Sequence, residues 1–161
     1  MSQFGTIYKH EILDTNEHFI DTVPAFLRWE IPALVVPLRI DFSFEAYTTN
    51  ATEPSKITVA LEPPTGYGDE LGNIPFARFE VNTTSYSKYS VTCQWSFATK
   101  RLGGDYGHNR LATFKQGAAD CYWAIPQPTK YVCLMVASQY GDTYIKNVNI
   151  KIWGFRIDTL G

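Results

Sequence analysis

The sequence predicts an all-β domain, a two-sheet antiparallel β-sandwich of the jelly-roll type with little helix. Apolar and polar residues alternate with a period of two in several segments, which is typical of strands that bury one face. Scattered prolines and glycines divide the chain into short pieces, as turns do in all-β domains. No segment keeps a helical period over three turns. Because a single flat sheet would leave apolar surface open, we expect two sheets packed face to face.

The length of 161 residues suits one domain, and we expect residues 1–161 to form a single jelly-roll. Residues 1–36 are less regular than the rest. Within them, residues 8–20 could hold a short helix, and the stretch 15–36 is rich in apolar residues and proline. That stretch could pack on a neighbouring subunit or cover the core of its own domain.

The clearest strand spans residues 37–47. One face carries the apolar side chains Leu38, Ile40, Phe42, Phe44 and Ala46, and the other face is mostly polar and ends with Tyr47. The same alternation predicts strands at 56–62, 76–81, 89–99 and 110–115. In these segments we expect the inward side chains to include Ile57, Val59, Leu61, Phe79, Val81, Tyr89, Val91, Cys93, Trp95 and Phe97.

Two further strands close the chain. Residues 130–138 are apolar on both faces, which predicts a strand in the middle of a sheet. Residues 144–158 change phase, since an inward series at 148, 150 and 152 gives way to another at 153, 155 and 157. One extra residue near Gly154 would reconcile the two series, so we expect a β-bulge or a bend there.

Composition excludes several partners. The formal net charge is -2 with no basic run, which disfavours both nucleic acid and an anionic membrane surface as ligands. The three cysteines lack metal-ligand spacing, so we expect buried, reduced thiols, with a Cys121–Cys133 bridge as the alternative. The first residues do not form a secretory signal, and we expect synthesis in a cytoplasm without export by a leader.

Three segments place a tyrosine before a glycine and a polar residue after it, at 66–69, 105–108 and 139–142. Tyrosine offers a large rigid face, and glycine allows a tight turn, so such loops suit stacking on a sugar or contact with a protein. The simpler alternative is that each only caps a sheet edge. The candidate binding residues are Tyr67, Asp69, Tyr106, His108, Asn109, Tyr140 and Asp142, together with Trp29 as a contact to a neighbouring subunit.

Motifs for catalysis are missing from the sequence. The three histidines form no metal-ligand pattern, and there is neither a nucleophile elbow nor a phosphate-binding loop. We therefore expect no catalytic residue, no metal and no cofactor. Two alternatives stay open: paired carboxylates of a glycosidase have no fixed spacing, and Asp69, Glu70, Asp142 and Asp158 could supply oxygens to calcium.

Two resemblances extend this interpretation. The patterns W-x-I-P at 123–126, T-K-Y-V at 129–132 and I-x-N-V-x-I at 145–150 resemble the closing strands of galactose-binding-like and carbohydrate-binding-module jelly rolls. The chain also resembles small jelly-roll spike, decoration and receptor-binding proteins of bacteriophages in its size, in its composition and in lacking a leader peptide. Residues 1–10 resemble the start of microvirus major spike proteins.

The sequence and these resemblances together leave three functions, in order of preference. The first is a non-enzymatic structural or attachment protein of a virus particle, located in the virion and bound to itself or to other virion proteins. The second is a carbohydrate-binding module that uses the loop tyrosines, with a host surface glycan as one ligand. The third is an enzyme of unknown type.

Overall fold

The structure is a computed structural model, and it describes residues 7–21, 24–62, 74–96, 101–108, 128–138 and 140–157. Within these residues every regular element is a β-strand, and all the strand pairs are antiparallel. No described helix could cross a bilayer. The strands are β1 (Tyr8–Asp14), β2 (His18–Ile20), β3 (Ala25–Thr48), β4 (Ser55–Glu62), β5 (Ile74–Val81), β6 (Ser87–Ser96), β7 (Arg101–His108), β8 (Thr129–Ser138) and β9 (Thr143–Ile157).

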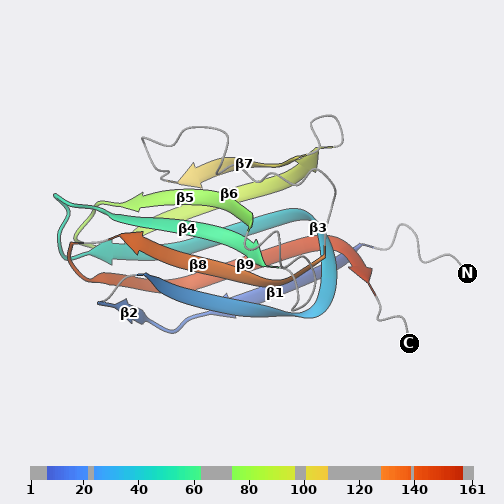
Figure 1. The fold of residues 1–161 in the computed structure, drawn as a ribbon, viewed down its shortest axis with the longest axis horizontal. Helices are drawn as coiled ribbons and strands as arrows, with labels where there is room; N and C mark the ends of the chain where they lie inside the picture. The colour runs from blue at the N-terminus through green and yellow to red at the C-terminus, as the bar shows by residue number, and fades with distance from the viewer. Residues whose placement is uncertain are drawn as a thin grey trace, which may run out of the picture.

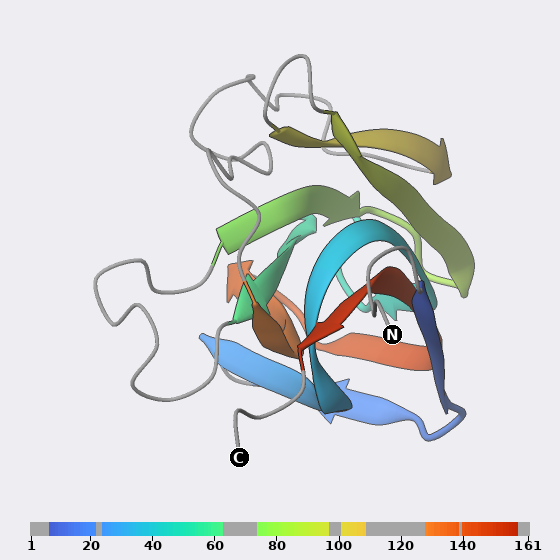
Figure 2. The same cartoon turned by 90° about the vertical axis from the view of Figure 1, so that its right-hand side faces the viewer.

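The strands form two layers joined by β3, which is 24 residues long. The first part of β3 pairs with β8, and the order β3–β8–β4–β5 makes the second sheet. The later part of β3 lies between β9 and β6, and the first sheet runs β1–β9–β3–β6–β7, with β2 also on β9. Figures 1 and 2 show β3 bending from one layer into the other. The predicted all-β sandwich is confirmed.

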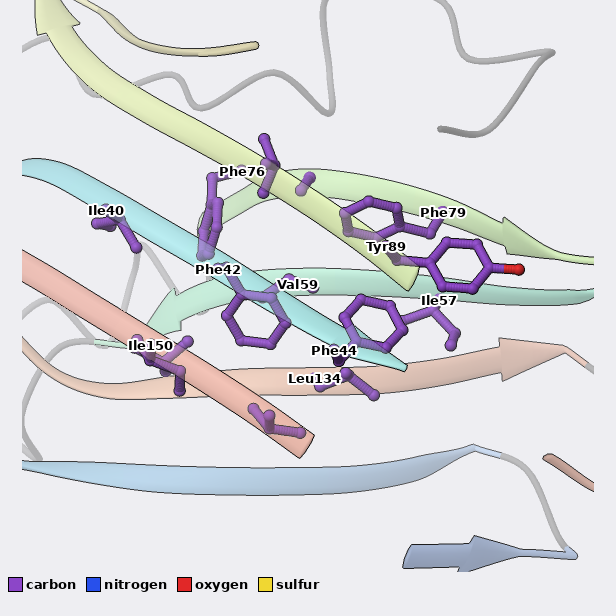
Figure 3. Close-up of a cluster of buried hydrophobic side chains, with 14 of the residues drawn as sticks. Ile40, Phe42, Phe44, Ile57, Val59, Phe76, Phe79, Tyr89, Leu134 and Ile150 are labelled. Carbon is purple, nitrogen blue, oxygen red and sulfur yellow. The ribbon is translucent and has the colours of Figure 1, made fainter. Parts of the chain in front are cut away.

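The core lies between the two layers and is rich in aromatic rings (Figure 3). The ring centroid of Phe44 lies 5.2 Å from that of Phe79, 5.2 Å from that of Tyr89 and 5.7 Å from that of Phe42. Each of these four side chains is 0% exposed. Alternation in β3, β5 and β6 brings them together, because every second side chain of a strand points to the same face.

Most of the inward residues predicted from the pattern are buried in the described structure. These are Ile40, Phe42, Phe44, Ala46, Ile57, Val59, Leu61, Phe79, Val81, Tyr89, Val91 and Cys93, whereas Leu38 is only half-buried. The central position of residues 130–138 is also confirmed, since β8 lies between β3 and β4. The predicted strand at 110–115 and the inward direction of Trp95 and Phe97 lie outside the described residues and side chains.

The N-terminal segment departs from the expectation. Residues 8–20 contain no helix but form β1 and β2, both paired with β9. In β1 the half-buried Tyr8 and Ile12 alternate with the exposed Lys9 and Glu11. Their period of two is that of a strand with one buried face, and only seven residues carry it. Residues 25–36 are regular as well, because they begin β3.

The irregularity predicted near Gly154 exists, but the extra residue lies in the partner strand. Pro37 pairs with Gly154 and Arg39 with Trp153, so the additional residue is Leu38 of β3. The phase change expected in β9 is wrong, since Ile152 and Gly154 are buried while Phe155 is 40% exposed. Gly154 occupies an inward position but has no apolar side chain, so the alternating pattern of apolar residues is interrupted there. Trp153 and Phe155 therefore resemble the start of a new inward series in the sequence.

A second irregularity shifts β9 against β3 near Asn147. Ser43 pairs with Asn149 and Glu45 with Lys146, which leaves one extra residue in β9. Asn147 has a φ of 51°, a left-handed conformation that asparagine tolerates better than most residues. Its side-chain amide donates a hydrogen bond to the carboxylate of Glu45. This bulge therefore turns a polar pair onto the outer face of the first sheet.

Candidate functional site

Four aromatic side chains from four segments lie side by side on the outer face of the first sheet. We call Phe19, Tyr144, Tyr47 and Tyr86 the aromatic row. Phe19 of β2 and Tyr47 of β3 both pair with Tyr144 of β9, and Tyr86 directly precedes β6. Buried Ala46, Thr48, Thr143 and Ile145 alternate with the row, so the aromatic rings point away from the core.

The rings of the row touch one another in sequence. The centroids of Phe19 and Tyr144 are 4.9 Å apart, and those of Tyr144 and Tyr47 are 4.6 Å apart with nearly parallel planes at 6°. Tyr86 meets Tyr47 at 4.7 Å with its ring at 89°, an edge-to-face contact. Phe19 is 52% exposed, and the three tyrosines are half-buried. The row is thus a line of touching rings in which Phe19 is the most exposed member.

Polar groups border the row on the same face. The Tyr86 hydroxyl donates to the carboxylate of Glu17, and the Lys146 ammonium lies 4.0 Å from the centre of the Tyr86 ring. Burial, and then this hydrogen bond to Glu17, raise the pKa of Tyr86 well above its ordinary value, so the hydroxyl keeps its proton. Glu45 and Asn147 add a carboxylate and an amide. The border therefore combines hydrogen-bond donors and acceptors beside apolar rings.

The loop before β9 lies at the same end of the sandwich. The backbone N–H of Asp142 donates to Thr49 Oγ1 at 2.8 Å, and the N–H of Thr49 donates back to the Asp142 carbonyl at 3.0 Å. A Cβ on Gly141 would lie 2.5 Å from Thr49 Oγ1, so the close approach requires glycine. These contacts hold Tyr140, which is 73% exposed, four residues before Tyr144.

The sequence-predicted residues divide into three groups. Tyr140 and Asp142 lie at the end of the sandwich that carries the aromatic row. Tyr106 and His108 belong to strand β7 and not to a loop, with Tyr106 paired to Val91 and His108 to Ser90, which corrects the expectation for 105–108. The third group, Tyr67, Asp69 and Asn109, lies outside the described residues.

Trp29 contacts its own chain. Its indole N–H donates to Asp14 Oδ2 at 3.0 Å, and His18 Nε2 lies 2.7 Å from the same oxygen. The Trp29 ring also meets the ring of Phe42 edge to face at a centroid distance of 6.2 Å. Trp29 is half-buried against the core, so the alternative that this stretch covers its own domain describes it.

Asp14 accepts hydrogen bonds from three directions, because the backbone N–H of Asn16 also donates to it at 3.0 Å. Burial acts to raise the pKa of Asp14, but the bonds from Trp29, His18 and Asn16 outweigh burial and lower it below 3.8. A group with a lowered folded-state pKa stabilises the fold above its unfolded pKa. That stabilisation is lost as the pH falls through the folded value.

We expect Asp14→Asn to lower the free energy of unfolding by roughly 1–2 kcal/mol at pH 7, since the charged acceptor of three donors is lost. The difference from the unmodified protein should shrink as the pH falls below about 4. Urea denaturation between pH 2 and pH 7 measures both quantities. A constant difference across this range would contradict the lowered pKa.

Two of the cysteines are free and buried, as predicted for Cys93 and Cys133. The Cys133 thiol donates to Glu62 Oε2 at 2.9 Å, and Arg28 forms an ion pair with the same carboxylate at 2.9 Å. Burial, and then the bond to Glu62, raise the pKa of Cys133 to about 12. The thiol is therefore protonated at neutral pH and unsuited to nucleophilic chemistry. Among the described residues no three acidic, histidine or cysteine side chains gather as a metal site.

The sequence patterns do not predict the aromatic row. The pattern placed Tyr47 on the outer face of its strand, and this was the one available signal. The other members lie far from it in the chain, at 19, 86 and 144. Strand register makes Phe19, Tyr47 and Tyr144 neighbours, and the turn before β6 brings Tyr86 against Tyr47. The composition of the loops instead favoured the Tyr-Gly segments as binding sites, because loops commonly carry binding residues.

No protein-family model matches the chain, and no curated protein matches it in sequence. Similar solved structures include peanut lectin with a nine-residue peptide, at 13% identity and a TM-score of 0.49, covering 96% of this chain and 100% of that one. Another is the CBM36-1 domain of a multidomain xylanase from the hindgut metagenome of Trinervitermes trinervoides. It shows 9% identity and a TM-score of 0.43 over 90% of this chain and 96% of that one.

A third similar structure is that of infectious bursal disease virus, Gx strain, at 6% identity and a TM-score of 0.35. That match covers 94% of this chain and 41% of the viral one. At such low identities and TM-scores, neither the ligands of these proteins nor the roles of their residues can be assigned to this chain. The fold assignment accordingly rests on the strand pairing described above.

Proposed function

We propose that this chain is a non-enzymatic recognition domain that binds carbohydrate on the outer face of its first sheet, at the aromatic row. The observation that carries the proposal is the row itself, four contiguous rings of which Phe19 is 52% exposed. Core packing does not require them, since they point to the outer face. An apolar ring surface in water gains free energy when the C–H face of a sugar covers it.

The polar border supports a sugar more than a purely apolar ligand. Glu45 and Glu17 accept hydrogen bonds, Lys146 donates them and the Asn147 amide does both, which suits a ligand with many hydroxyl groups. Rigid rings flanked by a few placed polar groups are the usual composition of small-molecule sites. Tyr140, at the same end of the sandwich, adds an exposed ring.

A glycan array followed by titration calorimetry on the best ligand tests the proposal. We expect Tyr144→Ala and Tyr47→Ala each to weaken binding about tenfold, which corresponds to about 1.4 kcal/mol. Both substitutions remove a ring that stacks on the other, so the row loses contact area and rigidity. Tyr86→Phe keeps its ring but removes the bond to Glu17, and a smaller loss is expected.

Tyr131→Ala is the matched control, because Tyr131 lies under Arg28 on the second sheet, away from the row. It should leave the affinity unchanged. Circular dichroism and thermal unfolding of each variant check that the fold is kept. Absence of binding to every glycan, or an equal loss in Tyr131→Ala, would contradict the proposal.

A structural or attachment role in a virus particle is the second candidate. The observation that favours it is the outer edge of β1, which no strand covers among the described residues, because the backbone groups of such an edge can pair with a strand of another copy. The two roles are compatible, since the row and the edge involve different residues.

A further inference from the structure

Strand β1 is the terminal strand of the first sheet and pairs on one side with β9. Among the described residues no strand pairs with its other side, and Figure 2 shows β1, in dark blue, at the edge of its layer. An edge strand presents a row of backbone N–H and C=O groups that can pair with another strand.

The residues of β1 and its neighbour Ile7 are self-complementary about His10. When the segment 7–13 is placed antiparallel to a copy of itself with His10 opposite His10, Lys9 faces Glu11 and Glu11 faces Lys9. The same register sets Ile7 against Leu13, and Tyr8 against Ile12. Apart from the His10 pair on the axis, every pair therefore joins opposite charges or two side chains with apolar surface.

Exposure agrees with this pairing. Ile7 is 48% exposed and Leu13 is 61% exposed, so both leave apolar surface in contact with water that a second strand could cover. Lys9 and Glu11 are exposed between them, on the same outer face of the sheet. Their contacts within the chain are long, 3.9 Å from Lys151 Nζ to Glu11 Oε2 and 5.3 Å from Lys9 Nζ to the Trp153 ring. Such exposed contacts contribute little and can be exchanged.

We propose that β1 pairs antiparallel with β1 of a second copy of this chain, with a twofold axis through His10. The first sheets of the two copies then continue into one another across the interface. Charged edge residues also serve to keep strands apart, and that alternative makes no use of the order of the charges. The palindromic order is what distinguishes a specific pair from a guarded edge.

The interface is small, because only seven residues on each side take part. Stable protein interfaces bury about 1,200–2,000 Å² in total, and a single strand pair buries less than that. We therefore expect a weak dimer with a dissociation constant on the order of micromolar. Sedimentation velocity of the full chain over a wide concentration range should show a monomer–dimer equilibrium.

Charge exchange tests the register. Lys9→Glu and Glu11→Lys alone each create two repulsive pairs across the axis, and we expect dimerisation about tenfold weaker or worse. The double variant Lys9→Glu with Glu11→Lys restores both attractive pairs in reverse, and its dissociation constant should return to within about threefold of the original. A monomeric wild type, or a double variant no better than the singles, would overturn the proposal.

A cysteine at the axis gives a second, independent test. Residues directly opposite in an antiparallel pair have Cα atoms about 4.5–5.5 Å apart, which a disulfide can bridge. Under mild oxidation His10→Cys should form a covalent dimer that the wild type, with its own cysteines, does not form. Lys9→Cys is the matched control, since position 9 faces position 11, and it should cross-link far less. Equal cross-linking of both variants would exclude this register.

Discussion

Replacing Phe44 by alanine should lower the free energy of unfolding by about 3–5 kcal/mol. Phe44 is 0% exposed and contacts the rings of Phe42, Phe79 and Tyr89, which come from three different strands. Alanine would remove the ring contacts and leave a cavity between the two sheets, because the surrounding rings are held by their own strands. Equilibrium denaturation in urea at neutral pH measures the loss.

Phe26→Ala is the control for this experiment. Phe26 lies in the same strand but is 56% exposed, so the same change of side chain should cost less than about 1 kcal/mol. Similar losses for the two variants would mean that Phe44 does not lie between two packed sheets. The sandwich arrangement itself would then be in doubt.

Replacing Gly154 by alanine should cost about 3 kcal/mol, although only one methyl group is added. A Cβ at this position would lie 2.1 Å from the carbonyl oxygen of Val36 and 2.7 Å from Val35 Cγ1. The nearest atom belongs to the backbone of the partner strand, so relief requires β3 and β9 to separate near the Leu38 bulge. The same denaturation experiment detects the loss.

Asn149→Ala, in the same strand on the outer face, provides the comparison and should change stability by less than about 0.5 kcal/mol. If Gly154→Ala were as mild as this control, the two strands could not approach as closely as the structure has them. The site would then tolerate a side chain.

The sequence predicted correctly those features that depend on the burial pattern within a single strand. Alternation in the segment 37–47 identified Phe42 and Phe44 as core residues, and the two apolar faces of 130–138 indicated a central strand. A strand with one buried face has apolar residues at every second position, and a strand covered on both sides has them at nearly all positions. Such patterns are local, so they can be recognised without knowing which strand is the partner.

Errors arose where a single strand gives too little information. The seven residues of β1 were too few to separate an edge strand from a short helix, and residues 105–108 were taken for a loop although they belong to β7. The extra residue near Gly154 was assigned to β9, whereas it is Leu38 of β3. A bulge is a property of two strands, so one strand cannot show which of them carries it.

For this protein, the order of apolar and polar residues by itself determined the all-β class, most of the core and the positions of the main strands. Tertiary structure alone decided the aromatic row, because strand register joins Phe19, Tyr47, Tyr86 and Tyr144 across gaps of tens of residues. It also decided that β1 lies at one end of its sheet, with no strand on its other side among the described residues. The physical reason is that the burial of each residue is reflected in its own polarity. Which residues are neighbours on a surface depends instead on which strands pair and in what register.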